Sequence, residues 1–214
     1  MDPNSLTELQ LDALREVNNI GCGAAATALS QLLTNRHVNL EVTRSAIISL
    51  SDLVILLGGP DETRVVILLA LRGGFEGHLL LSYSNGDAVD LAGILAGSSA
   101  TENSHELSDM GKSALMEVGN IVGSAFLNAV GKVSEMILLP SVPTLIHDPN
   151  HRIVEQLASL RVQEEEEISN LEEKLLVLET RLSIKEASGI QGTVIIIPKT
   201  NGLSSFLRKL GMKS

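Results

Sequence analysis

Two stretches of the chain, residues 12–29 (DALREVNNIGCGAAATAL) and 113–130 (SALMEVGNIVGSAFLNAV), share one pattern of polar and apolar positions. At about 100° per residue, the apolar side chains of each stretch gather on one side of a helix. This pattern is typical of an amphipathic helix that buries one side and exposes the other. The predicted apolar sides comprise Leu6, Leu14, Val17, Ala24, Ala28 and Leu32 in the first helix, and Leu115, Val118, Ile121, Val122, Ala125, Phe126 and Ala129 in the second.

The polar sides of the two helices repeat each other at a spacing of 101 residues. Because residues three apart are neighbours on a helix, each copy presents a carboxylate and a carboxamide together. Small residues follow in both copies and let another molecule come close to the helix. A purely solvated face is the structural alternative, but such a face more often carries Lys, Glu and Arg. The coinciding positions are Asp12 with Ser113, Glu16 with Glu117, and Asn19 with Asn120, and Gly23 and Ser124 continue the two stripes.

The first helix is predicted to begin at Ser5, with Glu8 completing a capping box, and to end near Leu33. Glycines at positions 21 and 23 cost about 1 kcal/mol each in a helix interior, which indicates that closeness to something else is needed there. Cys22 lies beside this stripe, and a small structural residue is favoured over a redox role.

The pattern after each long helix predicts a similar series of elements. In the first half we expect a strand over residues 38–50, a short ambiguous element at 51–59, a hairpin of 64–72 with 78–83, and a short helix ending at Leu95. In the second half, a strand at 137–146 is broken by Pro140 and Pro143. A helix from Arg152, a hairpin of 175–184 with 193–197, and a closing helix at 201–210 follow it. Residues 147–170 are expected to have no counterpart in the first half.

These elements predict an α/β fold of the layered α+β kind, with a pseudo-two-fold internal repeat. The sheet is expected to be mainly antiparallel, with the two long helices on one face. We expect a single domain over residues 1–214, in which repeat 1 spans 5–97 and repeat 2 spans 105–212.

Composition excludes several classes of partner. Aromatic residues make up 2% of the chain, with no Trp, so base-stacking surfaces are nearly excluded. The net charge of −10, without a cluster of Lys and Arg, argues against nucleic acid and anionic membranes. One cysteine allows no intrachain disulfide and suits a reducing cytoplasm. We expect no signal peptide, and the longest apolar runs, such as VVILLAL, are too short to cross a bilayer.

Motifs for the common catalytic chemistries are missing. The sequence has no Walker A loop, no GxSxG elbow, no HExxH and no Cys/His cluster. The acidic run at 164–167 is interpreted as a solvated segment rather than a metal site, because adjacent carboxylates on a helix do not converge. No metal site and no cofactor of its own are expected for this chain.

The doubled pattern Asp/Ser-x-x-x-Glu-x-x-Asn resembles the CheC family of phosphatases, whose relatives include CheX and the FliY middle domain. GFEGHLLL and GIQGTVIIIP also fit the paired hairpins of that family. The family motif ends with a proline a little over twenty residues after the asparagine. Pro143 meets this expectation in the second repeat, whereas the first repeat has no proline between Asn19 and Pro60.

The resemblance implies hydrolysis of the aspartyl phosphate on a CheY-like response regulator. It implies that the regulator supplies the phosphoaspartate, a bound Mg²⁺ and a lysine. Asn19 and Asn120 would orient water, and Glu16 and Glu117 would pair with that lysine. The alternative function is a non-catalytic adaptor for the regulator or for the deamidase CheD, or a flagellar switch component. A monomer in the cytoplasm is expected, because the internal repeat already supplies the symmetry of a dimer.

Overall fold

The computed structural model describes residues 6–34, 36–97, 106–165, 174–184 and 189–212. The helices in these ranges are α1 (Glu8–Leu32), α2 (Leu50–Leu56), α3 (Asn85–Leu95), α4 (Asp109–Ser134), α5 (Asn150–Glu165) and α6 (Thr200–Lys209). The strands are β1 (Val38–Ser49), β2 (Thr63–Gly73), β3 (Gly77–Ser84), β4 (Leu138–Pro140), β5 (Thr144–Pro149), β6 (Lys174–Ile184) and β7 (Gln191–Pro198).

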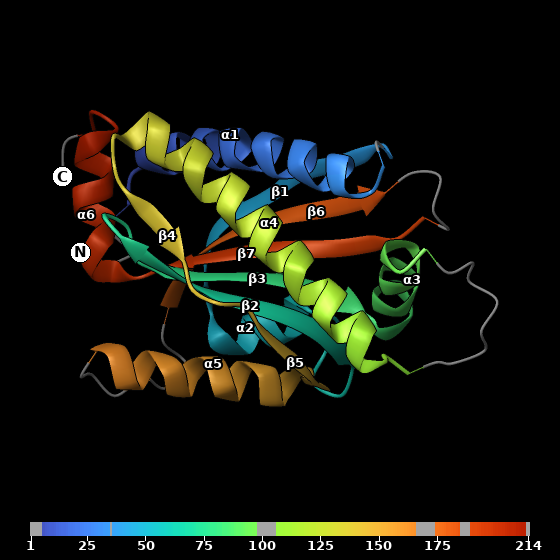
Figure 1. The fold of residues 1–214 in the computed structure, drawn as a ribbon. Coiled ribbons are helices and arrows are strands. Elements are labelled where there is room, and N and C mark those ends of the chain that lie inside the picture. Colours follow the sequence, from blue (N-terminus) through green and yellow to red (C-terminus); the bar gives the residue numbers. More distant parts are fainter. Residues whose placement is uncertain (1–5, 35, 98–105, 166–173, 185–188, 213–214) are drawn as a thin grey trace.

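The strands form one seven-stranded sheet in the order β1-β6-β7-β3-β2-β4, and β5 also pairs with β2. All of these pairings are antiparallel. The long helices α1 and α4 cross one face of the sheet, and α2 and α5 lie on the other (Figure 1). The layered α+β fold and the placement of the long helices are therefore confirmed.

The internal repeat is visible in the strand order. The central pair is β3 with β7, and each hairpin, β2–β3 or β6–β7, receives its outer strand from the other half of the chain. Thus β1 pairs with β6, and β5 pairs with β2. Reversing the order exchanges the two halves, which is the predicted pseudo-two-fold relation. The two halves interlock within one sheet, and the domain limits of 1–214 stay a prediction.

Alternate residues of the apolar strands face two separate cores. Val65, Ile67 and Leu69 of β2 pack under α1 and α4, whereas Val66 and Leu68 pack against α2 and α5. All five are buried. A strand covered on both faces needs no polar alternation, which explains the continuous apolar runs in the sequence.

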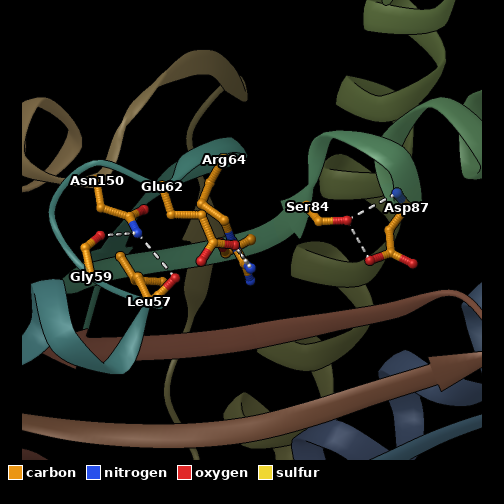
Figure 2. A network of polar contacts seen from close by, with 8 residues as sticks. Leu57, Gly59, Glu62, Arg64, Ser84, Asp87 and Asn150 are labelled. Carbon is orange, nitrogen blue, oxygen red and sulfur yellow. Dashed lines mark hydrogen bonds and ion pairs between the residues drawn. The ribbon is translucent and has the colours of Figure 1, made fainter. Parts of the chain in front are cut away.

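The prediction that residues 147–170 lack a counterpart is wrong for α5, and residues 166–170 lie outside the described residues. The short helix α2 follows β1 as α5 follows β5, and both pack on the same face of the sheet. The relation was hidden because α2 has 7 residues whereas α5 has 16. The Asn150 amide joins the two elements, donating to Leu57 O at 3.0 Å and to Gly59 O at 2.8 Å (Figure 2).

The start of α1 differs from the predicted cap. Thr7 is the N-cap, and Gln10 completes the capping box. The Gln10 N–H donates to Thr7 Oγ1 at 3.3 Å, and the Thr7 N–H donates to Gln10 Oε1 at 2.9 Å. Ser5 lies outside the described residues. The helix therefore begins at Glu8, where a capping box of the same kind is formed two residues later than predicted.

The two long helices approach each other where α1 carries a glycine. A side-chain carbon at Gly21 would overlap the ring of Phe126 on α4. The close approach predicted for Gly21 is therefore confirmed, and the element that comes close to it is α4. At Gly23, two residues later, no described atom beyond the adjoining helix backbone lies within 4 Å of an added side-chain carbon.

Gly21→Ala and Gly23→Ala are expected to change stability in opposite directions. Alanine favours the helix by about 1 kcal/mol, so Gly23→Ala should raise the free energy of unfolding by about that amount. Gly21→Ala should lower it by about 1–3 kcal/mol, because the methyl group meets the buried Phe126 ring. Thermal unfolding followed by circular dichroism measures both, at about 2–4 °C per kcal/mol for a chain of this size. Equal melting temperatures for the two variants would contradict the observed helix contact.

By length and composition alone, α4 is apolar enough to cross a membrane. Its apolar side instead lies on the sheet, where Leu115, Val118 and Val122 belong to the core. Gly119 and Gly123 bring its backbone against Ile67 and Leu69 of β2. These contacts are those of the core helix of a globular protein, and they account for the apolar composition of α4.

Candidate functional site

The four candidate residues all lie on the outer surface of the long helices. Glu16 and Asn19 are exposed on α1, and Glu117 and Asn120 are exposed on α4. Within the described part of the chain, no side chain bonds to any of the four side chains. Two carboxylates and two carboxamides thus face solvent with their hydrogen-bonding capacity unused, as predicted.

The remaining pair of coinciding residues, Asp12 and Ser113, forms different contacts in the two helices. Asp12 forms an exposed ion pair with Arg15, with Oδ1 2.7 Å from Nη1. The Ser113 hydroxyl donates to the backbone oxygen of Asp109 at 3.0 Å. Both groups are occupied within their own helix, so the features that the two helices share are the acid and the amide.

The buried side of α1 is rotated slightly from the predicted one. Leu14 and Val17 are buried as predicted, but Ala24, Ala28 and Leu32 are only half-buried. Their neighbours Ala25, Leu29 and Leu33 are buried instead. The helix is covered from two directions, by the sheet beneath it and by α4 at its side, and a single apolar stripe does not describe that environment. The exposed stripe with Glu16 and Asn19 is unaffected.

Buried polar contacts attach α1 to the sheet on the side of the helix opposite Glu16 and Asn19. The Asn18 amide donates to Thr180 Oγ1 of β6 at 3.2 Å, and the Cys22 thiol donates to Asn18 Oδ1 at 3.6 Å. The Thr180 hydroxyl also lies 3.4 Å from the Cys22 sulfur. Because Asn18 is fixed inward, the next residue, Asn19, points outward. Sequence analysis missed this role, since two adjacent asparagines look alike in a polar pattern.

At the corresponding positions, the second helix packs on the sheet through glycines instead of polar side chains. The positions on α4 that correspond to Asn18 and Cys22 at the 101-residue spacing are Gly119 and Gly123. There the helix backbone packs directly on aliphatic side chains of β2. The two sites therefore present the same outward groups on helices that are held to the sheet in different ways.

Cys22 is a structural residue. Burial raises the pKa of its thiol to about 11, although the hydrogen bond with Thr180 acts in the opposite direction. A thiol with a raised pKa forms little of the thiolate that nucleophilic or redox chemistry needs. The favoured interpretation of Cys22 as a small packing residue is confirmed.

The proline that distinguishes the two repeats lies at a break in the sheet edge. Pro143 separates β4 from β5, which both pair with β2. The position 101 residues earlier is Val42, where β1 stays continuous but its register with β6 shifts between Val42 and Arg44. Both repeats thus interrupt the ladder at the same place, one with a proline and the other with a bulge.

Within the described residues, no group of three or more His, Cys, Asp or Glu side chains could hold a metal ion. The acidic run at 164–167 lies partly outside the described residues, and its side chains are not described. Among the described residues, the groups that the two helices share at the surface are the acid and the amide, and the Ser113 hydroxyl beside them bonds to its own helix backbone. Such groups can orient a water molecule and bind a cationic side chain of another molecule.

Comparison with known proteins gives concordant results. A family model described as CheC-like matches residues 9–42, which include Glu16 and Asn19. The chain is 34% identical over 150 residues to the CheY-P phosphatase CheC of Bacillus subtilis (strain 168), an alignment covering 68% of this chain and 69% of the relative.

Solved structures share the fold. FliY of Thermotoga maritima superposes with a TM-score of 0.74 at 17% identity, covering 97% of this chain and 98% of that one. The CheX–CheY complex with BeF₃ and Mg²⁺ from Borrelia burgdorferi contains a chain that matches with a TM-score of 0.54 at 20% identity, covering 85% of this chain and 97% of that one.

Proposed function

The chain belongs to the CheC-like family, and from this premise we propose that it hydrolyses the aspartyl phosphate of a CheY-like response regulator. The observation that carries the proposal is the doubled acid and amide, exposed on both long helices and unpaired among the described residues. A relative named as a CheY-P phosphatase supports the choice of substrate.

The amides supply orientation. In hydrolysis of an acyl phosphate, a water oxygen forms a bond to phosphorus while the bond from phosphorus to the aspartyl oxygen breaks. The side-chain oxygen of Asn19 or Asn120 can accept a hydrogen bond from that water, and its NH₂ group can donate to a phosphoryl oxygen. Holding water in line in this way removes much of the entropic barrier, and phosphoryl transfer depends largely on positioning and charge stabilisation.

The carboxylates supply docking. Glu16 and Glu117 each lie three residues before the amide on the same helix. An acid one turn away can pair with a lysine of the regulator while the amide enters the phosphate site. Mg²⁺ held by the regulator would neutralise charge on the phosphoryl group, and this chain would add no metal of its own.

Measuring the loss of phosphate tests the proposal. A CheY-like regulator phosphorylated with acetyl phosphate should lose phosphate faster when the full chain is added, in proportion to its concentration. Binding without any acceleration would instead support the non-catalytic adaptor or flagellar switch function. The duplicated carboxamide favours catalysis, because docking alone does not require that group twice. Binding of CheD, a monomeric state and a cytoplasmic location stay predictions.

A further inference from the structure

Each long helix exposes apolar side chains beside its acid and amide. Leu9 on α1 is 68% exposed, and Met110 on α4 is 72% exposed. They lie at the same 101-residue spacing as the acids and amides. A second pair, Ile20 and Ile121, follows the same spacing; Ile20 is 38% exposed, and Ile121 is half-buried.

Helical geometry places these apolar residues along one edge of each polar stripe. With the acid at zero and about 100° per residue, Leu9 falls at about +20° and Ile20 at about +40°, whereas Asn19 falls at about −60°. Met110, Ile121 and Asn120 take the same angles around Glu117. Leu9 and Met110 lie seven residues before the acid, about 10 Å along the axis. Each helix therefore carries a polar edge and an apolar edge side by side.

Single exposed apolar residues are common on protein surfaces and need no explanation. Here the same kind of side chain recurs in the same register beside the same acid and amide, on helices that are seated on the sheet differently. Leu9, Ile20 and Met110 are exposed and belong to neither core. Ile121, which was predicted on the buried side of its helix, is half-buried and also belongs to neither core. The exposed apolar residues thus repeat together with the acids and amides, whereas the contacts of the two helices with the sheet do not repeat.

We propose that Leu9 with Ile20, and Met110 with Ile121, form two equivalent apolar edges that bind an aliphatic or aromatic side chain of the phosphorylated regulator. This inference rests on the proposed function and adds the surface that determines affinity. The occupant is the regulator because Ile20 and Ile121 directly follow the amides proposed to enter its phosphate site. The regulator would need an apolar side chain about 10 Å from the lysine that pairs with the acid.

The test treats one site at a time in the full chain. Leu9→Ser is combined with Asn120→Ala, so that only the first site is active, and is compared with Asn120→Ala alone. Met110→Ser is combined with Asn19→Ala, so that only the second site is active, and is compared with Asn19→Ala alone. Steady-state release of phosphate from an acetyl-phosphate-loaded CheY-like regulator gives KM and kcat. Each serine substitution is expected to raise KM by about tenfold with kcat unchanged, because the lost contact is equal in the ground and transition states.

Matched controls separate docking from folding. Leu9→Met and Met110→Leu keep the apolar surface and should keep KM. Ile55→Ser removes a side chain that is 71% exposed on α2, on the opposite face of the sheet, and should also leave KM unchanged. Because Asn→Ala keeps binding, the titration uses the double variant Leu9→Ser with Met110→Ser. Its affinity for the regulator loaded with beryllium fluoride and Mg²⁺ should fall by the same tenfold.

Failure of this inference differs from failure of the proposed function. Unchanged KM for both serine variants, with phosphate release intact, would overturn the apolar edges and leave the phosphatase. A fall in kcat at constant KM would also overturn them, because it would place these residues in catalysis rather than docking. No acceleration of phosphate release by the unsubstituted chain would overturn the proposed function itself.

Discussion

The double substitution Asn19→Ala and Asn120→Ala is expected to abolish the acceleration of regulator dephosphorylation by this chain. Removing one group that is aligned with a reacting centre typically costs about 10²–10³-fold in rate. Each helix carries one such amide, so both must be removed before the rate falls to that of the regulator alone. Asn120→Ala by itself should lose most of the activity, and the remainder should come from the first site.

Binding is expected to survive the same double substitution, because the carboxylates are untouched. Phosphate release and a binding titration should therefore be measured on the same variant. Asn39→Ala provides the control, since Asn39 is exposed on β1 and lies outside both stripes. Dephosphorylation at the unsubstituted rate in the double variant would show that the amides do not orient the water.

Charge reversal at both acids, Glu16→Lys with Glu117→Lys, is expected to weaken binding of the regulator by about 30-fold. A pair of unit charges 4 Å apart in water is worth about 1 kcal/mol, and reversal replaces that attraction with an equal repulsion. The resulting 2 kcal/mol corresponds to about that factor in the dissociation constant. The loss should shrink as ionic strength rises, because these charges are exposed and screened by salt.

A control variant separates the local effect from net charge. Glu41→Lys with Glu155→Lys changes the net charge by the same amount at exposed positions on β1 and α5. If the control weakened binding as much as the reversal at Glu16 and Glu117, general repulsion would explain the effect. Unchanged affinity after reversal at the stripes would count against pairing with a regulator lysine.

The exposed part of the site could be predicted from the sequence alone. The register of Glu16, Asn19, Glu117 and Asn120 follows from the helical period, and the structure leaves all four exposed. The strands and hairpins were equally predictable, because runs of β-branched and aliphatic residues separated by turns form locally recognisable elements. What the doubled pattern did not reveal was that α2 is the counterpart of α5, because a helix of seven residues carries too few positions to show a period.

The exposure of the apolar edges could not be predicted from residue type. Leu9 and Met110 look like core residues in a sequence, since leucine and methionine are usually buried. Only the packed structure shows that they face solvent on the acidic side of their helices. The repeat spacing is the sequence signal that could have indicated them.

The sequence by itself determined the two amphipathic helices, the duplicated acid and amide, and the series of elements in each half, because each depends on local periodicity. Tertiary structure decided which strand pairs with which hairpin, since β1 and β6 are joined across more than half the chain. It also decided that Asn18 turns inward to Thr180 and that Gly21 lies under Phe126. Which side chains of a helix are buried depends on every element that packs on it. The helical period of the sequence predicts one buried side, whereas α1 is covered both by the sheet and by α4.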